Sequence, residues 1–241
     1  MDEAVKIVEQ EHDYHVEFHI GTNPVFALIR KGGSSDIFVF FQVFISREYQ
    51  PLLDFFKTKQ VTPHTIIDAG ANVGYFSLLL ANEFSPSMIA AIEPEQGNVT
   101  QLRRNLENNI QSDKLLIIQA ALWTRKKRLS IRNEETREWA FSVIETEDGS
   151  QGDCDAMSLL DVMELASLDH IDLLKLDIEG TEGILFENVE FQNLLSKVAV
   201  IAMEIHDLRA DRKKIHDILR ERSFSFFEKG ELTVAWNKHL L

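Results

Sequence analysis

The sequence predicts an α/β protein built on a doubly wound, mostly parallel sheet of seven strands. Three observations carry this prediction. From residue 64 onward, short apolar runs alternate with stretches of helical periodicity, polar residues follow the apolar runs, and the last two runs flank a two-residue turn. Strands that alternate with helices form parallel sheets covered on both faces. A closing hairpin adds an antiparallel edge.

The first 63 residues predict a small N-terminal α+β extension. Alternating residues at His15–Ile20 and an apolar run at Val25–Arg30 predict a hairpin, and Pro51–Lys59 predicts a short helix. We interpret residues 1–63 as an extension or lid that belongs to the same domain as residues 64–241.

Residues 64–241 predict five strands with intervening helices and a final hairpin. The predicted strands are Thr65–Asp68, Ser87–Ile92, Lys114–Gln119, Ile171–Asp177 and Val198–Ile205. The predicted helices are Tyr75–Phe84, Gln96–Asn108, Ser158–Leu168 and Asp211–Arg222. The hairpin comprises Ser223–Lys229 and Leu232–Trp236, which flank Gly230-Glu231.

Composition indicates one globular domain. Of 241 residues, 44% are hydrophobic and 27% charged. Cys154 is the one cysteine and cannot form an internal disulfide, which fits a reducing compartment. The N-terminus has no apolar signal segment. The apolar run Ile37–Ile45 is too short to cross a membrane. We therefore expect a soluble, cytoplasmic protein with no membrane partner.

Polar side chains stand at the C-terminal ends of the predicted parallel strands. Asp68 ends the first strand, Glu93 the second, Asp177 the fourth, and Glu204 and His206 the fifth. Ligands of doubly wound sheets bind at this edge, where the strand order reverses. The pattern therefore predicts one ligand site.

The turn Asp68-x-Gly70-x-Asn72-x-Gly74 predicts a cofactor loop, because glycines let a ligand approach the backbone. It is not the dinucleotide motif G-x-G-x-x-G, and the carboxylate of Asp68 suits a cationic amino-acid group better than a pyrophosphate. Glu93 is placed to accept hydrogen bonds from two ribose hydroxyls. These features describe S-adenosylmethionine. The alternative is a structural turn followed by a helix-capping carboxylate.

Three motifs together are similar to those of a known family. They are Ile66-Ile-Asp68-Ala-Gly70-Ala-Asn72-Val-Gly74-Tyr-Phe-Ser77, Ile92-Glu93-Pro94, and Leu174-Lys175-Leu-Asp177-Ile-Glu179-Gly180-Thr-Glu182. From about Asp36 to about Asp207 the chain resembles the FkbM family of class I S-adenosylmethionine-dependent methyltransferases. The resemblance implies a Rossmann-like fold and methylation of hydroxyl groups on sugars, polyketides and related metabolites.

The resemblance also implies which residues meet the cofactor. The loop binds the methionine part, Glu93 binds the ribose, and the backbone near Ala120 lies beside adenine. The full set of expected contacts is Asp68, Gly70, Asn72, Val73, Gly74, Glu93, Pro94, Ala120, Ala121 and Tyr49. Many enzymes of this class have an Asp near Ala120, and this chain has none there.

The cluster after the fourth and fifth strands predicts the acceptor end of the site. A hydroxyl acceptor must be aligned and must lose a proton. The candidate catalytic residues are His206, Asp177, Glu179, Glu204 and Lys175. An ordinary His titrates near neutral pH, which suits a base. Taken singly, His206 can be an ordinary hydrogen-bonding residue, Lys175 an ion-pair partner and Glu182 a helix-dipole acid.

The same cluster contains ligand types that Mg²⁺ or Mn²⁺ accepts. No tight ligand spacing demands an ion, so the predicted site assigns no metal ligand. Trp139 and Phe141, between the third and fourth strands, are further candidates for substrate contacts.

Net charge limits the substrate. The chain carries 25 Lys and Arg against 39 Asp and Glu, a formal charge of −14 that disfavours a nucleic-acid partner. We predict O-methylation of a small metabolite, sugar or glycan, and the oligomeric state stays open. The alternatives are an N-methyltransferase, a catalytically silent S-adenosylmethionine-binding module, and an oxidoreductase, which the missing G-x-G-x-x-G motif opposes.

Overall fold

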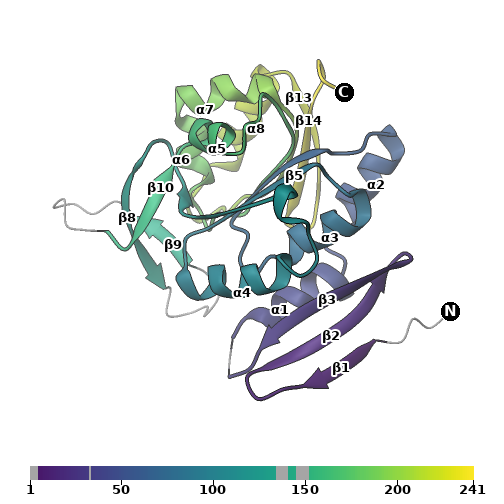
Figure 1. Cartoon of the computed structure of the whole chain (residues 1–241). Helices are drawn as coiled ribbons and strands as arrows, with labels where there is room; N and C mark the ends of the chain where they lie inside the picture. Colours follow the sequence, from purple (N-terminus) through teal and green to yellow (C-terminus); the bar gives the residue numbers. More distant parts are fainter. Residues whose placement is uncertain (1–4, 33, 134–140, 145–151) are drawn as a thin grey trace.

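The computed structural model describes residues 5–32, 34–133, 141–144 and 152–241. A seven-stranded sheet of order β13-β14-β12-β11-β4-β5-β6 forms its centre, and a three-stranded sheet of order β1-β2-β3 lies beside it (Figure 1). Strands β12, β11, β4, β5 and β6 pair in parallel, and β14 pairs antiparallel with β12 and β13. The predicted fold class is therefore confirmed, including the antiparallel C-terminal hairpin.

The bounds of the central elements follow the predicted ones closely. The strands are β4 (Thr65–Ala69), β5 (Met88–Glu93), β6 (Leu115–Gln119), β11 (Ile171–Leu176), β12 (Val198–Glu204), β13 (Phe224–Lys229) and β14 (Leu232–Asn237). The helices are α2 (Gln50–Lys59), α3 (Tyr75–Phe84), α4 (Gln96–Leu106), α5 (Leu159–Leu165), α6 (Glu182–Glu187), α7 (Val189–Leu194) and α8 (Arg212–Glu221). The sequence pattern does not predict α6 and α7, because six residues are too few to display a helical period.

Alternation along each strand divides the core into two layers. Ile66 packs in a cluster with α2, α3 and α4, whereas Ile67 packs in a second cluster with α5, α6, α7 and α8. The same alternation places Asp68 and Lys175 on the α3 side of the sheet. Both side chains therefore lie under the loop that joins β4 to α3.

The N-terminal part contains more structure than the sequence predicted. The expected hairpin is present as β2 (Asp13–Ile20) and β3 (Asn23–Arg30), and β1 (Lys6–Glu9) pairs with β2. The apolar run after it forms α1 (Asp36–Phe40), which continues as a π-helix over Phe41–Ile45.

Side chains of α4 and of the turn after it bind the backbone of β3 at two points. Asn105 Oδ1 accepts the N–H of Leu28 at 2.8 Å, and Asn109 Nδ2 donates to the carbonyl of Phe26 at 2.9 Å. The N-terminal sheet is thereby held against the helix that follows Glu93.

A four-stranded sheet of order β7-β10-β8-β9 follows β6. It comprises β7 (Ala121–Leu122), β8 (Lys127–Asn133), β9 (Phe141–Ile144) and β10 (Cys154–Met157). Trp139 and the side chain of Phe141 lie outside the described residues, so their substrate role stays a prediction.

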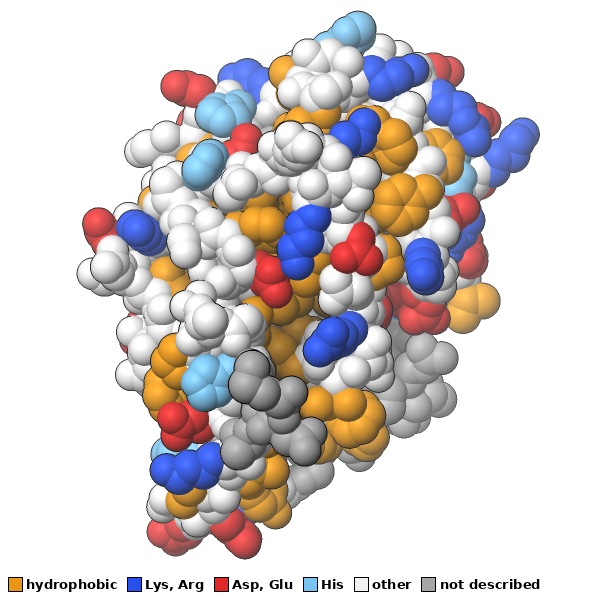
Figure 2. All heavy atoms as spheres, turned by 90° about the vertical axis from the view of Figure 1, so that its right-hand side faces the viewer, with side chains coloured by type: hydrophobic (Ala, Val, Ile, Leu, Met, Phe, Trp, Pro, Cys, Tyr) orange, Lys and Arg blue, Asp and Glu red, His pale blue; other side chains and the backbone are white. Residues whose placement is uncertain are grey.

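The surface mixes charges of both signs on the face that Figure 2 shows, where hydrophobic side chains appear in recesses between them. The acidic residues therefore do not form one continuous negatively charged patch on this face. Among the described residues, every helix is too short or too polar to cross a membrane.

Candidate active site

A cavity of about 180 Å³ opens where the strand order reverses, at the C-terminal ends of β4 and β11. Its wall brings together most of the residues predicted from the sequence. These are Tyr49, Gly70, Asn72, Glu93, Pro94, Ala120, Ala121, Lys175, Asp177, Glu179, Glu204 and His206. Asp68, Val73 and Gly74 lie behind this wall, within the loop or beneath it.

The loop glycines are required by packing within the chain itself. Gly70 has a φ of +75°, and a Cβ there would overlap the carbonyl oxygen of Asp177. Gly74 has a φ of +89°, and its Cβ would lie 3.1 Å from Leu106 of α4. These contacts differ from the ligand approach that the sequence analysis invoked. The result is a tight turn that exposes its backbone to the cavity.

Asp68 lies beneath the loop and is completely buried. Its Oδ2 accepts a 2.7 Å hydrogen bond from Ser77 Oγ, and its Oδ1 lies 3.4 Å from Lys175 Nζ. Lys175 therefore supplies a cation beside Asp68 within the chain itself, and the expected contact between Asp68 and a ligand amino group stays a prediction. Asp68 can influence a ligand through Lys175 and the loop.

Lys175 joins the ends of β4 and β11. Its Nζ donates to the carbonyl of Gly70 at 2.7 Å and lies 3.3 Å from Asp177 Oδ2. Burial lowers the pKa of Lys175, but Asp177 and Asp68 outweigh this effect and raise it overall. The side chain is a permanent ammonium and cannot serve as a base.

Glu93 presents a buried carboxylate at one end of the cavity. Its Oε2 accepts the N–H of Asn72 at 3.0 Å, and its Oε1 accepts the N–H of Glu95 at 3.0 Å. Burial raises the pKa of Glu93 to about 7, against the opposing effect of these hydrogen bonds. The carboxylate is thus held by the chain and retains lone pairs for a ligand.

His206 is surrounded by carboxylates at the other end. Its Nδ1 lies 3.1 Å from Glu182 Oε1, and its Nε2 lies 3.3 Å from Glu179 Oε2 and 3.8 Å from Glu204 Oε1. Burial lowers the pKa of His206, but hydrogen bonds to Glu179 and Glu182 outweigh it and raise the pKa to about 11. The expectation of titration near neutral pH is therefore wrong, because the carboxylates hold His206 as an imidazolium.

Glu204 has the near-neutral pKa that the sequence analysis assigned to His206. Burial, and then the charge of Asp177, raise the pKa of Glu204 to about 7. Its side chain is 29% exposed, and it lines the cavity. It is a partly accessible carboxyl group that can hold or release a proton near pH 7.

Several wall residues were not predicted from the sequence, and three of them carry a carboxylate or an amide that the site can use. Glu48 precedes α2, Glu231 lies in the turn between β13 and β14, and Asn98 lies in the first turn of α4. The sequence offered a signal for Asn98, because a polar residue in the first turn of the helix after Glu93 lies close to that carboxylate. The two glutamates carry no local signal, since only the tertiary fold brings them to the cavity.

Three ligand atoms of the acceptor cluster lie close enough to hold a cation. One atom each from Asp177, Glu179 and His206 falls within 4.8 Å of the other two. An ion there would have to displace the proton of His206, which weakens binding at neutral pH. The sequence assigned no metal ligand, and whether the site uses an ion is left to experiment.

The remaining predicted residues line the sides of the cavity. Tyr49 packs its ring 4.5 Å from that of Phe76, and Ala120 and Ala121 form the wall after β6. Residues 120–122 include no carboxylate, so the chain lacks the Asp that many enzymes of this class have near Ala120.

The fold and this site define a class I methyltransferase. Residues 68–226 match the model of the methyltransferase FkbM domain, which is more than half of the chain. The chain therefore belongs to the FkbM methyltransferase family.

Individual proteins are similar to the chain at low identity. Methyltransferase 1 of Beauveria bassiana (strain ARSEF 2860) is 24% identical over 182 residues, which cover 66% of this chain and 72% of that protein. The structure of magnesium protoporphyrin IX methyltransferase from Synechocystis PCC 6803 with bound SAM matches with a TM-score of 0.51 and 11% identity, over 86% of each chain. Methyltransferase FkbM from Methylobacillus flagellatus KT matches with a TM-score of 0.49 and 15% identity, over 72% of this chain and 43% of that one. The present chain thus spans less than half of the latter protein.

Proposed function

We propose that this chain is an S-adenosylmethionine-dependent O-methyltransferase that acts on a hydroxyl group of a small metabolite or sugar. One observation carries the proposal. A single cavity has a ribose-type carboxylate, Glu93, at one end and a carboxyl group poised near neutral pH, Glu204, at the other. Membership of a methyltransferase family supports the cofactor.

The residues of the cavity fit this cofactor. Glu93 offers a carboxylate to the two ribose hydroxyls, and Ala120 and Ala121 leave a flat apolar wall for adenine. The turn Gly70–Asn72 and the carboxylate of Asp177 face the methionine end. S-adenosylmethionine, when bound, supplies an electrophilic methyl group.

The acceptor end fits a hydroxyl group that loses its proton. Glu204 can take that proton, because its carboxylate is partly exposed and its pKa lies near neutral pH. His206 remains charged, and Glu182 orients it through Nδ1, so its Nε2–H can turn from Glu179, 3.3 Å away, and donate a hydrogen bond to the acceptor oxygen. The two side chains, 3.8 Å apart, would align the acceptor and remove its proton.

The test is methyl transfer from labelled S-adenosylmethionine to panels of hydroxylated metabolites and sugars. We expect S-adenosylhomocysteine and a methylated hydroxyl product with the wild-type chain. Cofactor binding without turnover on any acceptor would favour a catalytically silent module instead.

N-methylation is the second candidate, and the charge of the cavity favours it. Glu48, Asp177, Glu204 and Glu231 come from four segments and line the same wall. Burial and then the charge of Asp177 raise the pKa of Glu48. Burial raises the pKa of Glu204, and the charges of Asp177, Glu231 and Glu48 raise it further. These carboxylates therefore repel one another. An ammonium-bearing acceptor would relieve that repulsion. A parallel panel of amines decides between the two, according to which panel gives product.

The divalent cation is tested in the same assay. Asp177, Glu179 and His206 are the residues that would hold it. Turnover that is lost with EDTA and restored by Mg²⁺ or Mn²⁺ would establish metal assistance, and unchanged turnover would exclude it.

A further inference from the structure

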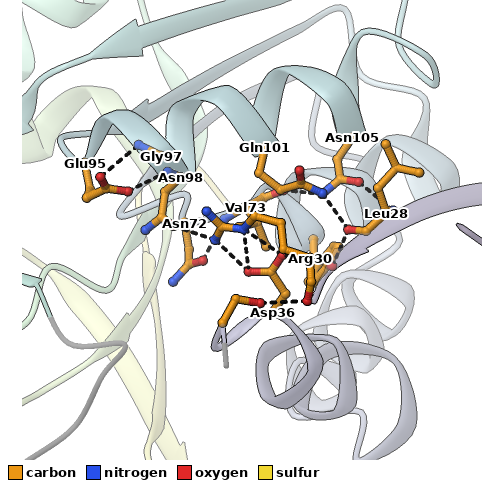
Figure 3. A network of polar contacts seen from close by, with 12 residues as sticks. Leu28, Arg30, Asp36, Asn72, Val73, Glu95, Gly97, Asn98, Gln101 and Asn105 are labelled. Atoms are coloured by element: carbon orange, nitrogen blue, oxygen red, sulfur yellow. Dashed lines mark hydrogen bonds and ion pairs between the residues drawn. The ribbon is translucent and has the colours of Figure 1, made fainter. Parts of the chain in front are cut away.

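A chain of hydrogen bonds connects the N-terminal sheet to the cavity wall. Arg30, at the end of β3, contacts Asp36, at the start of α1, through Nη2–Oδ1 at 2.6 Å and Nε–Oδ2 at 3.0 Å. The same Nη2 donates to Asn98 Oδ1 at 2.8 Å. Asn98 Nδ2 in turn lies 3.4 Å from Glu93 Oε1. Figure 3 shows the guanidinium of Arg30 joined to Asp36 and to Asn98.

Donor and acceptor types fix the direction of the Asn98 amide. A guanidinium can only donate, so it must face the amide oxygen of Asn98. The amide nitrogen is then turned toward Glu93, where an ionised carboxylate can only accept. With the amide oxygen and nitrogen exchanged, Arg30 would face a second donor and Glu93 a second acceptor.

Burial makes this arrangement rigid. Asp36 is completely buried, and its Oδ2 also accepts the backbone N–H of Arg30 at 2.9 Å. Asn98 is 4% exposed, and its backbone N–H donates to Glu95 Oε2 at 2.6 Å. A forked guanidinium held between fixed partners has little freedom to release Asn98.

We propose that Arg30, Asp36 and Asn98 are positioning residues of the cofactor site, which hold the carboxylate of Glu93 ionised and oriented for a ribose. The inference rests on the proposed function, because it takes Glu93 as the ribose ligand. Residues 30 and 36 precede the stretch that matches the family domain, so the N-terminal extension contributes to the site from outside that domain.

Several groups act on the charge of Glu93. Burial is the largest effect and raises the pKa of Glu93 to about 7. Hydrogen bonds from the backbone N–H groups of Glu95 and Asn72, and from the amide of Asn98, lower this pKa. The negative charge of Glu95 raises it. Further titratable groups nearby include Cys154 of β10 and, beyond Asn98, Arg30 with its partner Asp36 and the ring of Tyr75.

The sign of the effect follows from these groups. Ribose hydroxyls donate to an ionised carboxylate, so cofactor affinity should be constant above the pKa of Glu93 and fall below it. Loss of the Asn98 donor raises that pKa further, so the fall should begin at a higher pH. A purely structural role for Asn98 would weaken binding equally at every pH.

The experiment measures the affinity for S-adenosylhomocysteine by calorimetry from about pH 5 to about pH 9. The variants are Asn98→Ala, Asn98→Asp and Arg30→Lys. Arg30→Lys keeps the charge beside Asp36 but lacks the fork that reaches Asn98. The controls are Asn109→Ala, which loosens the turn after α4 from β3, and Glu93→Gln, which removes the titrating carboxyl.

The two Asn98 variants should move the midpoint of the pH dependence upward by roughly half a pH unit or more. Arg30→Lys should move it in the same direction by less, and Asn109→Ala should leave it unchanged. In the Glu93→Gln background, Asn98→Ala should cause no shift. A uniform loss of affinity in the Asn98 variants, without a midpoint shift, would overturn the proposal. Unchanged affinity in Glu93→Gln would instead contradict the ribose assignment itself.

Discussion

Two carboxyl groups at opposite ends of the cavity, one buried and one partly exposed, have pKa values raised to about 7, and we assign them different tasks. Glu93 is held by backbone N–H groups and is suited to binding, whereas Glu204 is held loosely beside a charged imidazolium and is suited to proton transfer. The assignment depends on environment, since the two side chains are chemically the same.

Glu204→Gln separates these tasks. The amide keeps the shape of the side chain but cannot accept the proton, so turnover should fall by roughly 10²-fold or more. Affinity for S-adenosylhomocysteine should stay near the wild-type value. Glu221→Gln, an exposed glutamate at the end of α8, is the matched control and should leave turnover unchanged. A Glu204→Gln enzyme with full turnover would remove Glu204 from the mechanism.

Single residues of the site were predictable where a motif or a strand end marks them. Glu93, Asp177 and Glu204 were found because each ends or follows a strand whose period is visible in the sequence. The charge of His206 was not predictable, since it depends on Glu182, which the fold buries beside it. Protonation states follow from tertiary neighbours, and a linear sequence does not give their distances.

At the scale of elements, the junction between β4 and β11 determines the shape of the cavity. Gly70→Ala should destabilise the chain by at least about 2 kcal/mol, because it combines a positive φ with overlap of the Asp177 carbonyl. Gly230→Ala is the matched control, with a φ of +62° and open space around its Cβ. Denaturant unfolding measures the difference. Equal losses in the two variants would show that β4 and β11 tolerate the extra atom.

Lys175 provides a second test of the same junction. Lys175→Met keeps the volume but leaves Asp68 buried without its cation, and the expected loss of stability is about 3–5 kcal/mol. Lys57→Met, which breaks an exposed pair with Glu83, should change the stability little. Denaturant unfolding measures both variants, and a Lys175→Met loss no larger than that of Lys57→Met would contradict this account.

The elements of the fold were predictable in proportion to their length and regularity. The five parallel strands and the final hairpin were found because each is an apolar run bounded by turn residues, and α3, α4 and α8 between or after them have ten or eleven residues. The run Ile37–Ile45 was read only as an apolar stretch, since a short α-helix that continues as a π-helix has no single period. Side-chain contacts to the backbone of β3, such as that of Asn105, leave no periodic trace at all.

At the scale of the whole molecule, three parts of the chain supply one site. The N-terminal extension contributes Tyr49 and Glu48, the parallel strands contribute Glu93, Asp177 and Glu204, and the C-terminal hairpin contributes Glu231. Carboxylates from several segments line the acceptor end of this cavity, and we expect them to select against anionic acceptors. The loop from Asp68 to Gly74 forms the framework of the site, and the side chains around it determine what the site can bind.

The central claim is that Glu93 holds the ribose of S-adenosylmethionine in this cavity, and calorimetry tests it most directly. Wild type and Glu93→Ala are titrated at about pH 8 with S-adenosylhomocysteine, where Glu93 is ionised. Because two hydrogen bonds to a charged acceptor are removed, the dissociation constant should rise by at least roughly tenfold, with the fold of the variant intact by circular dichroism. Equal affinity of the two proteins, or no binding by the wild type, would contradict the account.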